Sequence, residues 1–429
     1  MTANSDRERV GRRGFLATSA SSAAMILATH SAVEVAAQAQ KPTDAPTGPP
    51  VNCAVIGLGK QGRDLLAALS RVPGVTVTGI CDTYQPFLNR SKDAAPKATP
   101  ASDYRQVLER KDVSGIFIAT PTDRHRDIAV AALQAGKHVY CEAPLAHTVE
   151  DARGIALAAK TAPKQVFQVG QQFRSNPQHN HVWKFVRGAV VGRPACARAQ
   201  WHKKVSWRAT APTPDREREM NWRLRRETSP GLPGEVGIHS IDTMNWFLRS
   251  APVSVAAFGG NVLYQDGRTV PDTVQCVFEY PGGVRFMQDI TLANSFDGSY
   301  ELLMGDMGAV LLRGERAWLF KEADAPLEGW EVYARREPVG DETGIALVAD
   351  ATKILALGKV PGKDGSTLDP GKDALYYSVE AFANCIRQNK PAACGPMEGL
   401  QAAVTALKAH EASLTGAKIV FDKKWFELA

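Results

Sequence analysis

A short glycine run and one distant acid have the residue types and the spacing needed to hold a dinucleotide. The run reads Gly57-Leu58-Gly59-Lys60-Gln61-Gly62, and Asp82 follows its last glycine by twenty positions. In such a run the first glycine permits a tight turn, the second lets the backbone approach a pyrophosphate, and the third lets a helix pack closely on a strand. The acid would accept hydrogen bonds from ribose hydroxyls and repel a 2′-phosphate. These residues therefore predict a site for NAD rather than NADP.

This chemistry requires a strand before the glycines and a helix after them, and the sequence supplies both. Residues 51–56 are apolar, leucines recur at helical spacing over 65–69, and a second apolar run covers 75–81. The helix would begin at the glycines, where its free N–H groups and partial positive charge favour phosphates. Strands and helices keep alternating to residue 169. We therefore expect residues 51–172 to form a Rossmann domain with a doubly wound parallel sheet.

The pattern changes after residue 172. Apolar strands bounded by Gly or Pro turns now recur, at 193–202, 253–264, 273–280, 284–291, 299–305 and 308–320. A helix is expected before them, and two more after them, over 173–190, 375–388 and 397–414. The predicted fold class is α/β, with residues 173–429 forming a second domain on a large, mostly antiparallel open sheet. The last two helices come late enough in the chain to pack back on the Rossmann domain.

The first 39 residues carry the marks of an export signal. Arg12-Arg13-Gly14-Phe15-Leu16 is a twin-arginine signature, and an Ala/Ser-rich apolar run leads to a cleavage site at Ala37-Gln38-Ala39, with Val35-Ala36-Ala37 as the competing site. The apolar run is too short and too weakly hydrophobic for a stable membrane span. The alternative is a disordered basic tail. Residues 40–50, rich in Pro and Thr, would form a linker.

Export would place the protein in the periplasm and would constrain its cofactor. The twin-arginine route carries proteins that are already folded, so a cofactor can be acquired in the cytoplasm. Outside the inner membrane there is no NAD pool to exchange with. We therefore expect a tightly held NAD that is reduced and reoxidised in place.

Bulk composition argues against several other classes of protein. The chain is 44% hydrophobic, which is ordinary for a globular protein, and its net charge of +6 is too mild to argue for a nucleic-acid partner. The seven cysteines include no C-x-x-C pair and no metal-ligand spacing. We expect no metal site and no obligatory disulfide framework.

Taken together, these motifs resemble those of the Gfo/Idh/MocA family of NAD(P)-dependent sugar and cyclitol oxidoreductases, over nearly all of residues 51–425. The resemblance rests on the glycine run and on four further segments, which are Thr120-Pro121 with His125, residues 135–145 (AGKHVYCEAPL), Asn221-Trp222-Arg223, and residues 234–242 (GEVGIHSID). It implies an enzyme that acts on a hydroxyl of a sugar, sugar acid or cyclitol. It also implies a second-domain sheet that often forms an oligomer interface, so a homodimer or homotetramer is expected.

The resemblance assigns roles to individual residues. In the family, the histidine corresponding to His239 sits over the nicotinamide and takes the hydroxyl proton as hydride leaves the same carbon, a role that suits imidazole. Glu235, where the family has Asp, lies one helical turn earlier and would orient substrate hydroxyls or tune His239. The other implied contacts are to the cofactor from the glycine run, Asp82, Thr120, Pro121, His125, Glu142 and Ala143, and to the substrate from Gln172, Arg174, Trp222 and Arg223. From the residues alone, the alternative for His239 is a helix-capping or core histidine, and His125 could equally cap its own helix.

One position departs from the family pattern. The family usually has Glu-Lys-Pro where this chain has Glu142-Ala143-Pro144, and that lysine contacts both the reactive hydroxyl and the cofactor. A cation from the second domain could substitute, and the candidates are Arg174, Lys203, Lys204 and Arg223. Alternatively, the hydride step could be a transient part of a redox-neutral glycosidase or lyase cycle. A third possibility is a protein that binds nucleotide and sugar without turnover. An NAD-dependent oxidoreductase is the leading hypothesis.

Overall fold

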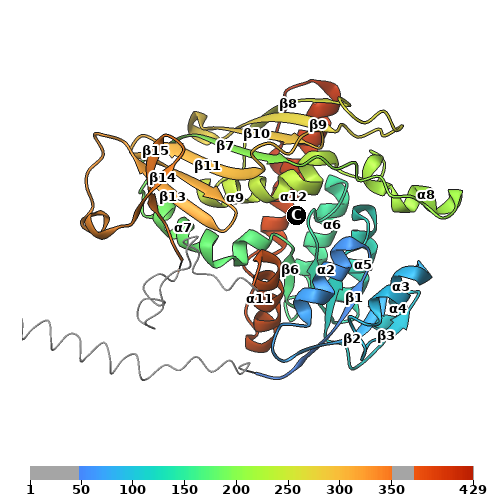
Figure 1. Ribbon diagram of the computed structural model, residues 1–429. Coiled ribbons are helices and arrows are strands. Elements are labelled where there is room, and N and C mark those ends of the chain that lie inside the picture. The colour runs from blue at the N-terminus through green and yellow to red at the C-terminus, as the bar shows by residue number, and fades with distance from the viewer. Residues whose placement is uncertain (1–47, 350–371, 429) are drawn as a thin grey trace, which may run out of the picture.

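The computed structural model describes residues 48–349 and 372–428. The predicted export signal at 1–39 and most of the predicted linker at 40–50 lie outside these residues. The described chain is organised around two sheets, a smaller parallel one and a much larger mixed one (Figure 1). None of the helices in the described ranges combines the length and the apolar character that crossing a membrane requires.

The first sheet has six parallel strands in the order β3-β2-β1-β4-β5-β6. The elements of this domain are β1 (Val51–Ile56), α2 (Lys60–Leu69), β2 (Val75–Cys81), α3 (Gln85–Ser91), β3 (Thr99–Ala101), α4 (Tyr104–Leu108), β4 (Gly115–Ile118), η1 (Thr122–Arg124), α5 (His125–Gln134), β5 (His138–Cys141), α6 (Val149–Lys160) and β6 (Phe167–Val169). Every residue of β4 is buried, as expected for a central strand covered by helices on both faces. The chain turns from β3 back past β1 to β4, so the predicted doubly wound parallel sheet is confirmed.

The second sheet has ten strands in the order β14-β15-β13-β12-β11-β7-β10-β9-β8-β16. Its strands are β7 (Pro194–His202), β8 (Ser254–Gly260), β9 (Thr273–Glu279), β10 (Arg285–Thr291), β11 (Ser299–Gly305), β12 (Gly308–Arg313), β13 (Arg316–Lys321), β14 (Arg336–Val339), β15 (Glu342–Ala346) and β16 (Ile419–Val420). Only β7 and β10 pair in parallel among these described strands, and the remaining neighbours are antiparallel. The predicted large, mostly antiparallel sheet is therefore confirmed.

Helices and short helical turns lie before, between and after the strands of this sheet. They are η2 (Gln172–Ser175), α7 (Pro177–Arg187), α8 (Pro214–Met220), η3 (Trp222–Leu224), η4 (Pro233–Gly237), α9 (Ile238–Leu248), η5 (Pro281–Gly283), η6 (Gly329–Tyr333) and η7 (Lys423–Phe426). The single helix expected over 173–190 was wrong in its start. The Asn176 side chain accepts hydrogen bonds from the amides of Gln178 and His179, and Pro177 takes the first helical position, so the helix begins there.

The strand expected over 308–320 is instead a hairpin of two strands. β12 and β13 pair antiparallel, and they are joined through Gly314, whose φ is +59°. Glycine adopts this left-handed conformation without the clash that a Cβ would cause. The turn consists of Gly314 and Glu315, between the apolar runs 309–312 and 317–320.

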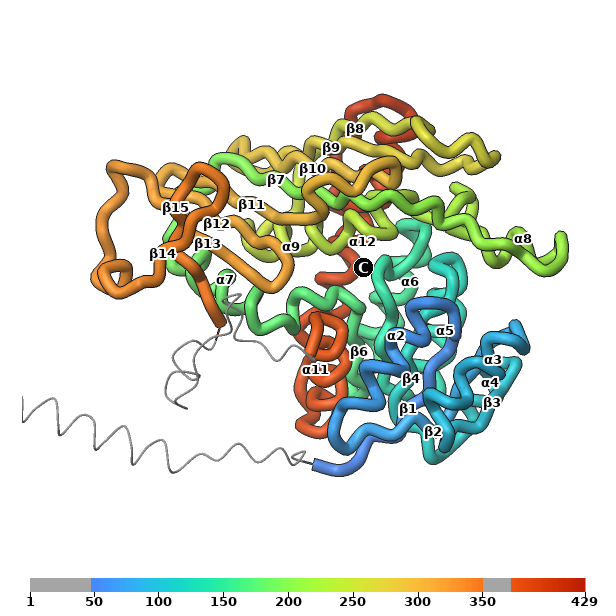
Figure 2. Tube along the Cα trace, in the orientation of Figure 1, coloured from blue at the N-terminus to red at the C-terminus, as the bar shows by residue number. Residues whose placement is uncertain are grey.

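The two C-terminal helices lie against both domains. α11 (Ala374–Gln388) packs on α2, and Phe382 lies 5.2 Å from Phe117 and 5.8 Å from Tyr140 between ring centroids. The Tyr140 hydroxyl also lies 3.1 Å from the Ser378 hydroxyl. α12 (Pro396–Thr415) packs between α6 of the first domain and β8 of the second (Figures 1 and 2). The C-terminal helices thus complete the hydrophobic core of the first domain.

Candidate active site

The glycine run forms the turn between β1 and α2. Gly57 has φ +91°, and a Cβ there would lie 2.6 Å from the Ala119 carbonyl carbon. A Cβ on Gly62 would lie 1.9 Å from the Gly57 carbonyl oxygen, so this position also requires glycine. A Cβ on Gly59 would meet no described atom within 4 Å. Packing therefore does not require a glycine at position 59. The open space there would let a ligand lie close to the backbone.

The start of α2 is arranged to receive an anion. Gly59 occupies the N-cap position, and no side chain in the described structure caps the amides of the first turn. Those N–H groups carry the positive end of the helix dipole. Leu58 is buried, whereas Lys60 is 82% exposed and pairs with Asp64 at 2.6 Å. The backbone rather than the lysine is therefore placed to bind phosphate.

Asp82 lies at the carboxyl end of β2, next to this turn. Its Oδ2 accepts a hydrogen bond from the Leu58 amide at 2.7 Å, and its Oδ1 accepts one from the Tyr84 amide at 2.8 Å. Burial raises the pKa of Asp82, and the two amide hydrogen bonds oppose that rise. The carboxylate is thus fixed in orientation at the position where a Rossmann domain binds ribose.

The loop after β4 contains Thr120 and Pro121, and His125 begins the helix α5 that follows. The Thr120 hydroxyl is buried without a hydrogen-bond partner in the described chain, which is the condition of a group that waits for a ligand. His125 is buried, with Nδ1 3.0 Å from the Pro144 carbonyl oxygen and Nε2 3.0 Å from the Thr120 carbonyl oxygen. Burial lowers its pKa. Both of its ring nitrogens face backbone carbonyls, so His125 fastens two loops together and offers no free nitrogen.

Glu142 connects the glycine run to the end of β5. Its Oε1 accepts a hydrogen bond from Gln61 Nε2 at 2.9 Å, and burial raises its pKa to about 7. Gly170, just beyond β6, lies directly against it, because a Cβ on Gly170 would be 2.5 Å from Glu142 Oε2. Ala143 follows Glu142 and is half-buried. Position 143 therefore lies at the same sheet edge as the nucleotide turn.

His239 enters this region from the first turn of α9. Its Nδ1 lies 3.1 Å from Oε1 of Gln171, which follows Gly170, and the edge of Phe173 packs on the ring. An amide oxygen opposite Nδ1 requires the hydrogen on Nδ1, so the lone pair is on Nε2. No described residue is hydrogen-bonded to Nε2. Burial lowers the pKa of His239 to about 4, so the imidazole is neutral at pH 7.

Glu235 makes contacts that differ from those expected. It lies in the π-helical turn η4, and its side chain is 2% exposed. Oε2 accepts a hydrogen bond from Arg223 Nε at 2.8 Å, and Oε1 lies 3.3 Å from the hydroxyls of Ser229 and Thr122. None of its contacts within the described residues reaches His239. Glu235 therefore holds Arg223 and joins the second domain to Thr122 of the first.

The other proposed substrate residues are Arg174, Trp222 and Gln172. Arg174 donates from Nε and Nη2 to both oxygens of Asp242, at 2.8 and 3.0 Å, and is 10% exposed. Its role is structural, and Asp242 is its buried partner. Trp222 packs under the Arg223 guanidinium, whose carbon lies 4.7 Å from the ring centroid. Gln172 begins the turn next to Gln171 and is half-buried.

Beneath His239 the structure contains an aromatic stack that the sequence did not indicate. Phe173 stacks on His179 at 4.2 Å between centroids and meets His239 edge-on at 5.8 Å. His179 is 2% exposed, and neither of its ring nitrogens has a hydrogen-bond partner among the described residues. Burial lowers the pKa of His179 to about 3.

The change His179→Phe is expected to make folding less sensitive to acid. As the pH falls below the ordinary value of 6.5, the unfolded chain binds a proton that the folded chain excludes until about pH 3. The free energy of unfolding therefore falls through this window, by up to about 1.4 kcal/mol per pH unit from this residue. Urea unfolding of both proteins at several pH values measures the effect. The stability difference should shift in favour of the variant as the pH drops, and a difference independent of pH would contradict the assignment.

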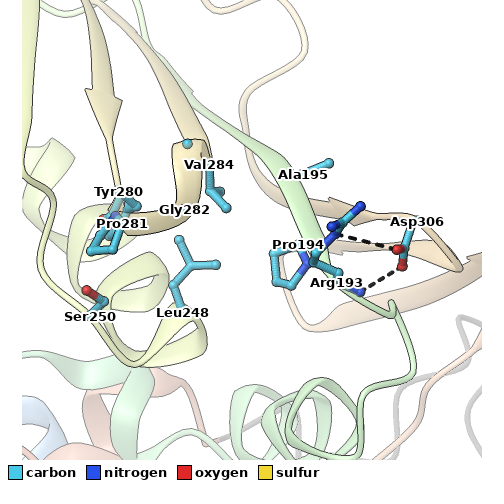
Figure 3. Close-up of a pocket in the computed structure, with 11 residues that line it drawn as sticks. Arg193, Pro194, Ala195, Leu248, Ser250, Tyr280, Pro281, Gly282, Val284 and Asp306 are labelled. Atoms are coloured by element: carbon cyan, nitrogen blue, oxygen red, sulfur yellow. Dashed lines mark hydrogen bonds and ion pairs between the residues drawn. The ribbon is translucent and has the colours of Figure 1, made fainter.

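A separate hollow lies at the far end of the second-domain sheet (Figure 3). It is lined by Leu248, Ser250 and the turn Tyr280–Val284, with Arg193 paired to Asp306 at its side. His239 lies in the first turn of α9 and Leu248 ends the helix, so the hollow lies about 14 Å along the helix from the imidazole. Elsewhere in the described structure, no three His, Cys, Asp or Glu side chains gather as a metal site would require. The groups able to perform chemistry therefore lie at the junction of the two sheets.

Comparisons with known proteins find similarity in both domains. Residues 51–171 match the model of an oxidoreductase family with an NAD-binding Rossmann fold, and residues 179–310 match the GFO/IDH/MocA C-terminal domain. Inositol 2-dehydrogenase of Salmonella typhimurium is 30% identical over 196 residues, 45% of this chain and 53% of that protein, so the match spans about half the relative's length. 1,5-anhydro-D-fructose reductase of Ensifer adhaerens is 27% identical over 315 residues, 72% of this chain and 80% of that protein.

A solved structure shares most of the fold. A levoglucosan dehydrogenase in complex with NADH superposes with a TM-score of 0.71 at 18% identity, and covers 86% of this chain and 99% of that one. The two family models together match more than half of the chain. This chain therefore belongs to the Gfo/Idh/MocA family, and its first domain is an NAD-binding Rossmann domain.

Proposed function

We propose that the protein is an exported NAD-dependent oxidoreductase that oxidises a hydroxyl group of a sugar, sugar acid or cyclitol. The observation that carries the proposal is the state of His239, whose Nδ1 is held by Gln171 while Nε2 is free. A chain of contacts connects it to the nucleotide turn, from Gln61 to Glu142 and from Glu142 to the Gly170-Gln171 segment. The relatives' names indicate the substrate class, because inositol, anhydrofructose and levoglucosan are polyhydroxylated rings.

His239 would act as the general base. Its neutral imidazole accepts the hydroxyl proton on Nε2, and Gln171 stabilises the resulting N–H on the opposite side of the ring. When bound, NAD supplies the acceptor for the hydride that leaves the same carbon. The residues that would hold it are the backbone at 57–62, Asp82 on the ribose, and the loop at Thr120 and Pro121.

The experiment begins with the folded, purified protein. Denaturation should release one NAD per chain, identified by mass, and a panel of sugars and cyclitols should then reduce the bound NAD, seen as nicotinamide fluorescence. Absence of any dinucleotide would overturn the proposal. Release of aglycone from aryl glycosides without net reduction of NAD would favour a redox-neutral glycosidase or lyase. A full complement of NAD that no sugar reduces would favour a non-catalytic sugar-binding protein.

Retention of NAD is supported by a contact across the two domains. Arg216 on α8 donates hydrogen bonds to the Thr83 carbonyl at 3.1 Å and to the Thr83 hydroxyl at 3.4 Å, and it lies over the Tyr84 ring. Thr83 and Tyr84 directly follow Asp82. Figure 2 shows α8 at the end of an arm that leaves the second domain on this side. The arm therefore covers the end of the site where the ribose would lie, and would slow its escape.

The change Arg216→Ala is expected to speed release of NADH by about tenfold, since it removes the two hydrogen bonds to Thr83, of roughly 0.5–1.5 kcal/mol each. Arg218→Ala is the matched control, because Arg218 lies on the same helix and is exposed. Stopped-flow displacement of fluorescent NADH measures both rates. Equal dissociation rates in the two variants would show that α8 does not retain the cofactor.

Export is proposed from the twin-arginine signature at residues 12–16. The double change Arg12→Lys with Arg13→Lys should keep the protein in the cytoplasm, because the signature requires the arginine pair. Fractionation of expressing cells provides the measurement. Periplasmic recovery of the double variant would remove the argument for a non-exchanging cofactor.

A homo-oligomer is proposed through the outer face of the large sheet. Phe258, Val277 and Met287 lie on neighbouring strands β8, β9 and β10 and are 72%, 41% and 38% exposed. Register places them on the same face, where water contact with apolar side chains is unfavourable. Light scattering of the purified protein distinguishes a dimer or tetramer from a monomer.

A further inference from the structure

The junction of the two domains holds carboxyl groups, but the reaction needs a cation there. Removing the hydroxyl proton leaves negative charge on the substrate oxygen until the hydride departs, and a fixed positive donor lowers the energy of that state. Glu142 and Glu235 cannot serve, because both are acids. His239 cannot serve either, because it must begin the reaction neutral.

The contacts of the nearby cations leave one that is suited to this task. Arg174 uses Nε and Nη2 on Asp242 and is buried. Lys203 and Lys204 are exposed on the segment that follows β7. Arg223 uses only Nε, on Glu235, and its side chain is 42% exposed. Within the described residues, no hydrogen bond is found to either of its Nη atoms.

Arg223 is also held where its charge acts on both carboxyl groups. Trp222 and Trp207 flank its guanidinium, at 4.7 and 5.8 Å from the ring centroids. The Arg223 charge opposes the rise in the pKa of Glu142, so the guanidinium lies within electrostatic reach of the residue before Ala143. Glu235, its anchor, lies one turn before His239, roughly 6 Å away along the helix. Thr122 fixes the same anchor to the loop that holds Thr120.

We propose that Arg223 is the cation of this site, and that its Nη groups donate hydrogen bonds to the reacting substrate oxygen in the role of the motif lysine that Ala143 replaces. The inference rests on the proposed function. In the step, His239 Nε2 takes the hydroxyl proton, the hydride leaves carbon with its electron pair for the bound NAD, and the oxygen becomes a carbonyl. Arg223 keeps all its protons throughout, because a guanidinium does not titrate in this range.

The contrast with Arg174 separates this role from a structural ion pair. A structural arginine satisfies its fork inside the protein, as Arg174 does on Asp242. Arg223 is fixed at one nitrogen, its two Nη atoms have no hydrogen bond within the described residues, and its side chain is 42% exposed. A guanidinium that is held in orientation, with Nη groups that make no other hydrogen bond, is suited to bind a ligand oxygen.

The test compares Arg223→Gln with Arg226→Ala in the NAD-loaded protein. Glutamine can still donate to Glu235 but carries no charge. Arg226 is 64% exposed and lies three residues away, so its loss gives the same change in net charge. We expect R223Q to lower kcat by about 100-fold or more, the usual effect of removing one oxyanion donor. NADH affinity should stay within about twofold in both variants, because the adenosine and phosphate contacts are elsewhere.

Restoring kcat with a second substitution is the more specific test. Adding Ala143→Lys to Arg223→Gln returns a cation to the same space from the first domain, and should restore at least about tenfold of the lost kcat. A positioning defect in Glu235 would not be repaired from position 143. Equal kcat in R223Q and wild type, or the absence of any rescue, would overturn the inference.

Sulfite binding tests the role of Arg223 without a sugar substrate. Sulfite adds reversibly to the nicotinamide carbon that accepts hydride, and it brings negative charge to that point. Its apparent Kd, read by absorbance, should rise by about tenfold or more in R223Q and fall again when Ala143→Lys is added. If wild type binds NAD but oxidises no sugar, the proposed function fails while the sulfite series still decides the inference. An unchanged sulfite Kd in R223Q would overturn it.

Discussion

Replacing His239 with Asn is expected to lower kcat for hydroxyl oxidation by about 10²- to 10⁴-fold, the usual contribution of a general base. Asparagine can still hydrogen-bond to Gln171, so the local structure should survive, but it has no nitrogen able to accept the proton. Binding of NADH should remain within about twofold, because His239 makes none of the contacts proposed for phosphate or ribose. Single-turnover reduction of bound NAD by sugar, followed by fluorescence, measures the chemical step directly.

The matched control is His202→Asn. His202 ends β7 and faces Asp289 at 3.0 Å, on the large sheet, so the same substitution there should leave kcat unchanged. The wild-type rate should also stay level in mild acid and fall as the pH approaches 4, because protonation at the pKa of about 4 removes the base. A H239N variant that keeps a third or more of the activity would show that another group takes the proton.

Replacing Gly62 with Ala is expected to damage the nucleotide domain itself. The new Cβ would lie 1.9 Å from the Gly57 carbonyl oxygen, a contact that only a backbone shift can relieve. Overpacking of this kind usually costs about 1–3 kcal/mol, and here it displaces the turn that binds phosphate. Thermal unfolding without ligand should show a lower Tm, and NADH binding should weaken by about 100-fold or more.

The paired variant Gly59→Ala separates folding from binding. Gly59 has φ −60° and open space around its Cβ position, so the ligand-free Tm should not change. Its methyl group would instead occupy the space left for a pyrophosphate, so NADH affinity should fall by about tenfold. Normal NADH binding by G59A would place the phosphates elsewhere.

The fold was predictable where local pattern decides the structure. Residues 51–82 predict a strand, a turn, a helix and a strand, because apolar periodicity and glycine geometry act within a few residues. The order of the second sheet was not predictable in the same way. β7 lies between β11 and β10, and residues nearly a hundred positions apart must meet to form those pairs. No local propensity encodes such partners.

The site residues likewise fall into those that local sequence predicts and those that only packing brings together. The glycine run and Asp82 follow from spacing, and His239 follows from the resemblance of residues 234–242. The contacts of Arg223 with Glu235, of Arg216 with Thr83, and of Phe173 with His179 arise from packing between elements distant in sequence. Ala143 was visible as a departure, but only the different hydrogen bonding of Arg174 and Arg223 indicates which cation stands nearby.

The position of α11 has a consequence for synthesis of the chain. Phe117 and Tyr140 are made long before Phe382, the ring that packs on both of them. On the nascent chain, the side of the first sheet that packs on α11 therefore stays uncovered until α11 is made, although amino-terminal domains generally fold first. A prematurely terminated product would expose those two rings to water, and would be marked for proteolysis rather than released as a half-working protein.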